Sequence, residues 1–482
     1  MSPVKEGQSG VSTRSRTIMA VLWLGVGACN WTKFSDDADR APVRSIGSPS
    51  GFDSSDFGKS LLPLSGGQGS AAAFIATGFN GSHLALVKVD DHGGVTSAAV
   101  STTAFTDTES SAVTSVAEIA GSSPTLLLLG TPTVRDKDFG RVYTYQLPGP
   151  AVAGLGDGAV TTLHSKLGEM DSGLGRGLAT GFVGGVAGTA DLIIGGDNDL
   201  AVVVDGNPEM TAVATVPVPG PDGDCEVAYE HLQDPRYLAR RPLATARLWA
   251  DPAGVQQILV GSTHAGTPGK VGIMALGPGG TTLSCLASIT GTQPKFGHAF
   301  AVGDFDGDGA DDLAISAPPK QVLVYLGWSK LPIGTVPAPL APVVSNTGVD
   351  FGFSITALNV DGLPGDELLI SDPRATVGGQ ANAGQVLGFK YDPASATMVS
   401  LAAPLAEFSD HAPESDAAFG YTVNGLNFCR TDPASLAGGP CPISDLSRIL
   451  LVGASNEVFV YFRVGSNIPM PTGATAPDVR TP

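Results

Sequence analysis

A ten-residue stretch of this chain has the residue types and the spacing needed to bind a hard cation. It runs from Asp304 to Leu313 and reads Asp-Phe-Asp-Gly-Asp-Gly-Ala-Asp-Asp-Leu. Alternate side chains of a tight loop point inward, so its carboxylates converge and repel one another until a cation neutralises them. Counted from the first aspartate, the predicted ligands at positions 1, 3, 5, 7 and 9 are Asp304, Asp306, Asp308, the carbonyl of Ala310, and Asp312.

Every one of these ligands is an oxygen, which suits Ca²⁺ better than Zn²⁺ or Cu²⁺. An EF-hand is excluded, because position 12 is Ile315 and not a glutamate, and because strand-like segments flank the loop. The sequence therefore predicts Ca²⁺ as the cofactor. An acidic turn without a metal is the alternative.

A second loop repeats this frame with fewer ligands. Leu363 replaces the carboxylate at position 5, and Pro364 replaces a glycine, so we expect weaker binding there. In a third loop, from Val183 to Asp191, only the last ligand survives, and we expect that loop to be purely structural. The oxygen donors kept by the second loop are Asn359, Asp361, Gly365 and Glu367.

Motifs of catalysis are not found in the sequence. It has no Gly-x-Ser-x-Gly, His-Glu-x-x-His or Gly-x-Gly-x-x-Gly, and its seven histidines are scattered. Gly58-Lys59-Ser60 lacks the first glycine of a phosphate loop, because Asp53 stands there. An active site assembled from several distant segments stays open.

Paired apolar runs flank the loops and recur along the chain. Each run has about four to eight residues, is rich in β-branched and aromatic side chains, and ends at Gly, Pro, Asp or Asn, which indicates strands rather than helices. Seven such pairs occur, at the spacing of about 50–65 residues that suits one four-stranded blade. The sequence predicts an all-β fold: a seven-bladed β-propeller of four-stranded antiparallel blades. A solenoid is the rival, but no capping units are found.

Two short elements recur with the runs. Phe-Gly stands at residues 57–58, 296–297, 351–352 and 419–420, with Leu174-Gly175 as an equivalent, and Gly-Ala-Pro-like triplets end at Pro132, Pro318 and Pro373. On these elements the chain resembles the FG-GAP repeat family, the propeller of integrin α-subunit heads and of many bacterial surface proteins. The resemblance covers roughly residues 50–465. It implies that the Asp304 loop joins the first two strands of a blade and binds Ca²⁺.

The N-terminus has the pattern of a secretory signal. Arg14 and Arg16 precede a short apolar run, and Gly27-Ala28-Cys29 follows it. This pattern resembles a bacterial lipobox with Cys29 as the lipidated residue; an ordinary signal peptide is the alternative. Asn30 is compatible, by resemblance, with outer-membrane sorting in a Gram-negative cell. The predicted domains are a signal at 1–28, a tether at 29–40, the propeller at 41–466 and a Pro-rich tail at 467–482.

Four cysteines remain if Cys29 carries lipid, an even number in an oxidising compartment. Three pairings are possible; we favour Cys225–Cys285 and Cys429–Cys441. A soft-metal site is disfavoured because no Cys-x-x-Cys occurs. Since little strand-forming sequence follows Phe462, we also expect residues 41–47 to supply the outer strand of the last blade.

Charge narrows the range of partners. The formal net charge is −19, and the sequence contains no run of Lys and Arg that could contact a phosphate backbone. Nucleic acid is therefore not expected as a partner. We expect a non-enzymatic, calcium-stabilised propeller, lipid-anchored at the cell envelope or secreted, that binds a cell-surface protein or a polysaccharide. The alternative is an envelope hydrolase or lyase that acts on polysaccharide at the propeller axis.

Overall fold

A computed structural model gives the fold of the central part of the chain. It describes residues 44–47, 57–64, 71–77, 84–90, 95–101, 115–119, 125–131, 141–147, 161–164, 175–184, 190–196, 199–203, 214–217, 225, 242–250, 254–262, 268–277, 282–293, 295–345, 348–402, 407–410, 413–429, 446–455 and 457–462. The predicted signal, the tether with Cys29, and the tail all lie outside these residues.

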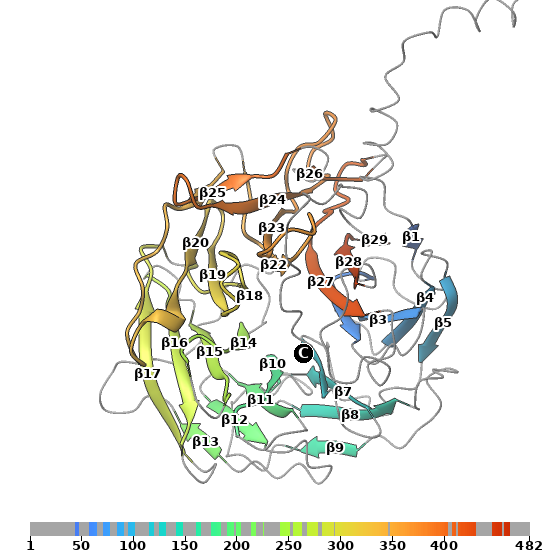
Figure 1. The fold of residues 1–482 in the computed structure, drawn as a ribbon. Helices are drawn as coiled ribbons and strands as arrows, with labels where there is room; N and C mark the ends of the chain where they lie inside the picture. Colours follow the sequence, from blue (N-terminus) through green and yellow to red (C-terminus); the bar gives the residue numbers. More distant parts are fainter. Residues whose placement is uncertain are drawn as a thin grey trace, which may run out of the picture.

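The described strands form separate antiparallel sheets, in which strands adjacent in sequence are hydrogen-bonded neighbours, apart from β1 (Arg44–Gly47) and β26 (Glu407–Phe408) (Figure 1). The first three sheets contain β2 (Ser60–Leu64), β3 (Ala71–Thr77), β4 (Leu84–Asp90) and β5 (Val95–Ser101); β6 (Ser115–Ile119), β7 (Thr125–Thr131), β8 (Arg141–Leu147) and β9 (Thr161–His164); and β10 (Gly177–Gly181), β11 (Asp191–Gly195), β12 (Asp199–Val203) and β13 (Ala214–Pro217).

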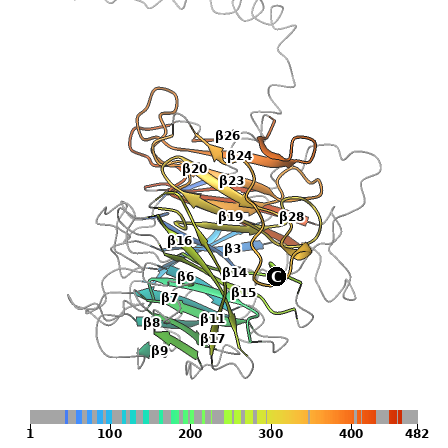
Figure 2. The same ribbon diagram turned by 90° about the vertical axis from the view of Figure 1, so that its left-hand side faces the viewer.

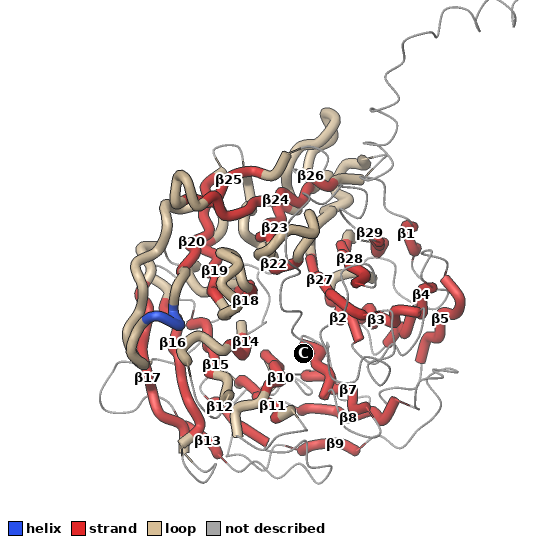
Figure 3. Tube along the Cα trace, viewed as in Figure 1, coloured by secondary structure: helices blue, strands red, loops and turns tan. Residues whose placement is uncertain are grey.

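The later sheets follow the same order, and strands joined by loops make up nearly all of this region (Figure 3). They contain β14 (Leu243–Ala246), β15 (Gln257–Ser262), β16 (Lys270–Leu276) and β17 (Leu283–Thr290); β18 (Phe300–Gly303), β19 (Asp312–Ala317), β20 (Gln321–Tyr325) and β21 (Val343–Val344); β22 (Ile355–Leu358), β23 (Glu367–Asp372), β24 (Gln385–Asp392), β25 (Thr397–Ser400) and β26 (Glu407–Phe408); and β27 (Thr422–Cys429), β28 (Leu446–Gly453), β29 (Glu457–Phe462) and β1 (Arg44–Gly47).

One sheet departs from the predicted four strands. In the β22–β25 sheet, β26 adds a fifth strand by pairing with β24 beside β25. Phe408 of β26 is fully buried, so this short addition covers apolar surface that the four strands leave open. The helix found in the described residues is the short 3-10 turn η4 (Trp328–Lys330).

The second strand of a sheet is the most deeply buried. All residues of β15, β19 and β23 are buried, because these strands have a neighbouring sheet on each face. This packing explains why the corresponding sequence runs are continuously apolar rather than alternating. It also fixes the loop that precedes each second strand on a rigid base.

The sheets are arranged around a common centre. The first strand of each sheet contacts the first strand of the next, in the order β2, β6, β10, β14, β18, β22 and β27, and β27 in turn contacts β2. Figure 1 shows β10, β14, β18 and β22 near this centre and β9, β13, β17 and β25 at the rim, and Figure 2 shows the sheets stacked on one another from the side. The arrangement is all-β and propeller-like.

The N-terminal segment joins the C-terminal sheet. β1 pairs antiparallel with β29, with Ile46 opposite Val458. The prediction that the 41–47 segment adds a strand to the last sheet is confirmed for Arg44–Gly47. Further bonds cross from β27 to the first sheet, since Thr422 Oγ1 and Asn424 Nδ2 donate to the carbonyls of Lys59 and Leu61, at 2.5 and 2.6 Å.

The Phe-Gly elements are turns that lock the start of each first strand. The phenylalanines of the Phe-Gly pairs that lie in the described residues are fully buried: Phe57, Phe296, Phe351 and Phe419. The following glycine has a positive φ and donates its N–H to the triplet that ends the second strand, as from Gly297 to Ser316 O at 3.0 Å and from Gly352 to Ser371 O at 2.9 Å. The two recurring elements of the sequence thus bind each other.

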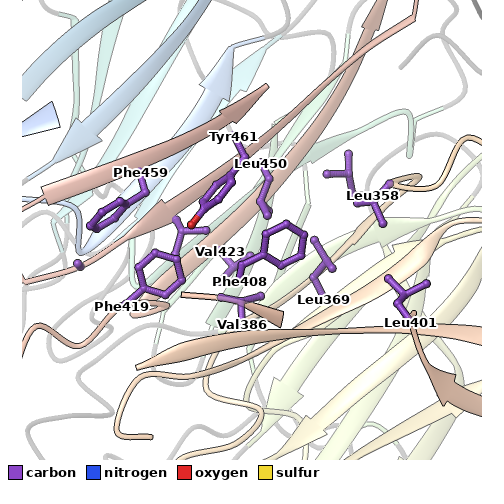
Figure 4. Packing of buried hydrophobic residues seen from close by; sticks show 13 residues of the cluster. Leu358, Leu369, Val386, Leu401, Phe408, Phe419, Val423, Leu450, Phe459 and Tyr461 are labelled. Carbon is purple, nitrogen blue, oxygen red and sulfur yellow. The ribbon is translucent and has the colours of Figure 1, made fainter. Parts of the chain in front are cut away.

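Aromatic and aliphatic side chains fill the space between neighbouring sheets. Between the β22 and β27 sheets, Phe419 packs on Phe459 with ring centroids 5.0 Å apart, and Phe408 packs on Tyr461 at 5.3 Å (Figure 4). Burial of such a contiguous cluster is the main force that holds one sheet against the next.

Among the described residues, no helix has the length and the apolar composition of a membrane span.

Candidate metal centre

The predicted cation loop joins β18 to β19 and ends on a buried carboxylate. Asp312 is the first residue of β19 and is 1% exposed. Its Oδ2 accepts the backbone N–H of Phe305 at 3.1 Å, and its Oδ1 accepts that of Gly327 at 3.0 Å. Asp312 therefore ties the loop and the segment before η4 to the buried strand.

The same position plays this role in neighbouring sheets. The first residue of β11, β15 and β23 is also polar and buried, and it accepts an N–H from the loop before it. The bonds run from Val183 to Asp191 Oδ2 at 2.8 Å, from Leu248 to Gln257 Oε1 at 2.8 Å, and from Val360 to Glu367 Oε2 at 2.6 Å. Gln257 was missed in the sequence, although a polar residue directly before a continuous apolar run was the available signal.

Three of the four predicted carboxylates converge. Asp304, Asp306 and Asp312 each offer an oxygen within 4.8 Å of the others. Asp304 Oδ2 accepts the N–H of Gly309 at 2.8 Å, whereas Asp304 Oδ1 is buried and has no hydrogen-bond partner. A buried carboxylate oxygen without a donor is costly, and a cation bound by the three carboxylates would satisfy it. The residues present therefore fit Ca²⁺.

The fourth carboxylate, Asp308, is paired with a lysine. Its Oδ2 lies 2.8 Å from Nζ of Lys330, the last residue of η4, and the same Nζ lies 3.8 Å from Asp306 Oδ2. Its Oδ1 accepts the N–H of Ala310 at 2.9 Å. Coordination by Asp308 and by the carbonyl of Ala310 stays a prediction, and Lys330 is a neighbour that the sequence did not indicate.

Burial and the crowding of like charges shift the pKa values of the carboxyl groups in this loop. Burial raises the pKa of Asp304 and of Asp306, and it raises the pKa of Asp312 to about 8, with a further contribution from the charge of Asp306. For Asp308, burial is the largest single influence, but the hydrogen bonds from Lys330 and from the N–H of Ala310, together with the charge of Lys330, outweigh it, and the pKa is lowered. Without a cation, the inner part of the loop thus favours protonated carboxyls.

The second candidate loop, between β22 and β23, brings its four predicted residues together in a different way. Asn359 Oδ1 accepts the N–H of Gly362 at 2.9 Å, and its Nδ2 donates to the carbonyls of Leu363 and Gly365 at 2.5 and 2.9 Å. Asp361 Oδ1 accepts the N–H of Leu363 at 2.9 Å, and burial, followed by the charge of Asp361, raises the pKa of Glu367 well above its usual value.

The two loops lie side by side. Asp304 donates its N–H to Asp366 Oδ2 at 3.0 Å, and Asp366 donates its N–H to Asp304 O at 2.6 Å. A similar bond links the two preceding sheets. Asp311, which directly precedes β19, accepts at its Oδ2 the N–H of Arg247, which directly follows β14, at 2.6 Å. These contacts couple each loop to the sheet beside it.

One predicted disulfide is present and the other lies outside the described residues. Cys225 is bonded to Cys285 of β17, 60 residues further along the chain. The backbone of Cys429 ends β27, but Cys441 is outside the described residues, so the Cys429–Cys441 pair stays a prediction.

Comparison with known proteins supports the repeat in the region of this loop. Residues 296–325 match the FG-GAP repeat family model, and this segment contains the Phe296-Gly297 turn, β18, the Asp304 loop, β19 and β20. The chain therefore contains an FG-GAP repeat at the site where the carboxylates converge.

The chain also has partial sequence similarity to phosphatidylinositol-glycan-specific phospholipase D. It is 31% identical to the Rattus norvegicus protein over 149 residues, which is 29% of this chain and 17% of that protein. With the Bos taurus protein it shares 31% identity over 162 residues, which is 32% of this chain and 19% of that protein. The chain thus spans less than one fifth of the length of these curated relatives. The family match over residues 296–325 identifies an FG-GAP repeat in this all-β, propeller-like protein.

Proposed function

We propose that this protein is a seven-bladed, calcium-stabilised β-propeller that serves as a non-catalytic binding platform at the cell envelope. The seven described sheets are its blades, and β1 closes the ring by completing the blade of β27. The contact of β27 with β2 supports this closure. So does Gly58, where a side chain would lie 2.6 Å from the carbonyl oxygen of Glu457. Ca²⁺ bound by Asp304, Asp306 and Asp312 would supply positive charge to the loop, without taking part in a reaction.

The observation that carries the binding role is a row of aromatic side chains on three adjacent sheets. His298, Phe353 and Tyr421 each follow a Phe-Gly turn, at the start of a first strand. The rings of His298 and Phe353 lie 5.5 Å apart, and those of Phe353 and Tyr421 lie 5.0 Å apart. All three residues are half-buried. Aromatic side chains are enriched at protein-binding surfaces.

The composition of the first strands supports binding over catalysis at the axis. Among the described first strands, the charged side chain is Glu118 of β6, and the others are built mainly from Gly, Ala, Val, Leu and Thr. An envelope hydrolase or lyase would need acids and bases from several blades to converge there. The partial similarity to a phospholipase D motivates one further assay: we expect no hydrolysis of phosphatidylinositol-glycan substrates.

A binding screen tests the proposed function. The protein without residues 1–28 is applied to glycan and cell-surface protein arrays, with Ca²⁺ and with EGTA, together with the Phe353→Ala and Tyr421→Ala variants. We expect a ligand that both variants lose. Tyr391→Ala, which removes a half-buried aromatic ring from β24 of the same sheet as Phe353, is the control and should bind normally. Equal binding by all variants would place recognition elsewhere on the ring.

The cation and the anchor have separate tests. Isothermal titration with Ca²⁺ should show a site that Asp304→Asn removes, with a melting temperature that EGTA lowers in the parent and leaves unchanged in the variant. Mass spectrometry of the mature protein, with Cys29→Ser as the control, should find a lipidated Cys29 in the membrane fraction. An unmodified N-terminus would favour the ordinary signal peptide and a secreted protein.

A further inference from the structure

We infer that the Asn359 amide takes the place of the cation in the 359–367 loop, which makes this loop a built-in, metal-independent counterpart of the Asp304 loop. The inference uses the same loop frame as the proposed Ca²⁺ site. The two loops follow equivalent first strands, β18 and β22, and end on equivalent buried acids, Asp312 and Glu367. Asp304 and Asn359 therefore occupy the same position.

The two side chains at this position differ in one atom and in its surroundings. Each uses one oxygen to accept a backbone N–H, from Gly309 to Asp304 and from Gly362 to Asn359. The other oxygen of Asp304 is buried with no hydrogen-bond partner. In Asn359 that atom is Nδ2, a donor, and it donates to the carbonyls of Leu363 and Gly365.

The hydrogen bonds determine the orientation of the amide. The N–H of Gly362 is a donor and must face Oδ1, and the two carbonyls are acceptors and must face Nδ2. The amide has two hydrogens for two acceptors, so its donors are fully used. Asn359 is 7% exposed, so reversing the amide would leave these buried groups unsatisfied.

One of the carbonyls held by Asn359, that of Gly365, is at the position where the cation frame uses a carbonyl ligand. Leu363 and Gly365 stand at positions 5 and 7 of the loop, and Gly365 was a predicted ligand at position 7. A cation there would have to displace both hydrogen bonds and lie beside an amide donor that repels it. The loop is thus folded around a neutral amide and needs no metal.

This loop in turn supports the loop that is proposed to bind Ca²⁺. The paired bonds between Asp304 and Asp366 connect the first residue of one loop to the last turn of the other. Because the 359–367 loop needs no metal, it remains a fixed neighbour of the Asp304 loop whether or not a cation is bound by Asp304. Asn359 is therefore a positioning residue that acts through Asp366.

The substitution Asn359→Asp tests the inference because it exchanges the donor for an acceptor at constant size. The new carboxylate at position 359 would join those of Asp361 and Glu367. With the carbonyls of Leu363 and Gly365, these groups would form an all-oxygen site. We expect titration with Ca²⁺, or with luminescent Tb³⁺, to show one site more than the parent, and EGTA to lower the melting temperature more than in the parent.

The same substitution in the Asp304→Asn background separates this inference from the proposed function. A gain of one site in both backgrounds supports the inference. It does so even if the parent and the Asp304→Asn variant bind the same number of ions, a result that would argue against the proposed site at 304–312. An unchanged number of sites in a folded Asn359→Asp protein overturns it.

A second variant covers the case in which Asn359→Asp does not fold. Asn359→Ala frees the carbonyls of Leu363 and Gly365 and leaves Asp361 and Glu367 in place. We expect millimolar Ca²⁺ to raise its melting temperature more than that of the parent. An equal or smaller rise would contradict the proposed role of the amide.

Discussion

The carboxylate of Asp366 accepts the backbone N–H of Asp304 at 3.0 Å, across the boundary between two sheets. The bond is reciprocated, because Asp366 donates its own N–H to the carbonyl of Asp304. Asp366 directly precedes Glu367, which caps its own loop through the N–H of Val360. Two successive acidic residues thus hold two different loops, one in the neighbouring sheet and one in their own.

We expect Asp366→Ala to lower the free energy of unfolding by about 1–3 kcal/mol, because the part-buried N–H of Asp304 loses its acceptor. Urea unfolding measures the change. Glu407→Ala, which removes an exposed carboxylate from β26, is the control and should be close to neutral. Equal effects of the two substitutions would argue against a clamp between the sheets.

Stability without a cation should depend on pH through Asp312. The pKa of this buried carboxyl is raised from 3.8 to about 8, so between these values the folded state keeps a proton that the unfolded state releases. The free energy of unfolding of the EGTA-treated protein should therefore fall as the pH rises through this window. Because Ca²⁺ neutralises the carboxylate, added Ca²⁺ should reduce the fall. Thermal melts across the window, with and without EGTA, measure both effects, and parallel curves would contradict this account.

Lys330 should weaken cation binding, because its ammonium group already lies 2.8 Å from Asp308 Oδ2 and 3.8 Å from Asp306 Oδ2. Lys330 is exposed, so its contribution is small, and we expect Lys330→Met to increase the Ca²⁺ affinity about two- to fivefold at low ionic strength. Lys320→Met, beyond the opposite end of β19, is the matched control. A change that is equal in both variants would assign the effect to net charge rather than to the ion pair.

The pairing of β1 with β29 should contribute to stability independently of the Asp304 loop. Ile46 of β1 is 9% exposed and stands opposite Val458 of β29. We expect Ile46→Ala to lower the free energy of unfolding by about 2 kcal/mol or more. Ile333→Ala makes the same chemical change at a side chain that is 56% exposed, and it should change the free energy little. The difference between the two variants in urea unfolding reports the packing of β1.

The disulfide between Cys225 and Cys285 closes a loop across 60 positions and should stabilise the protein by about 2–4 kcal/mol. Cys285→Ser should lower the free energy of unfolding by this amount under non-reducing conditions. Peptide mapping without reduction identifies the Cys225–Cys285 pair in the parent. The same map tests the predicted Cys429–Cys441 pair, for which two free thiols would be the contrary result.

The sequence by itself determined the strands and the composition of the loops, because both depend on local patterns. Short apolar runs bounded by Gly, Pro and Asp favour strands, and the alternating aspartates of 304–312 favour an oxygen-rich loop. The use of Arg44–Gly47 as a strand of the last sheet also followed from the sequence, since few strand-forming residues follow Phe462.

Only the tertiary structure decided how each ligand is used, because that depends on neighbours from other sheets and on single hydrogen bonds. It separated Asp308, which faces Lys330, from the three carboxylates that converge. It gave Asp312 and Gln257 the same capping role despite their different side chains. It also turned Asn359 from a weak ligand into an internal donor, a change that no spacing rule shows, since the direction of an amide is fixed by what surrounds it.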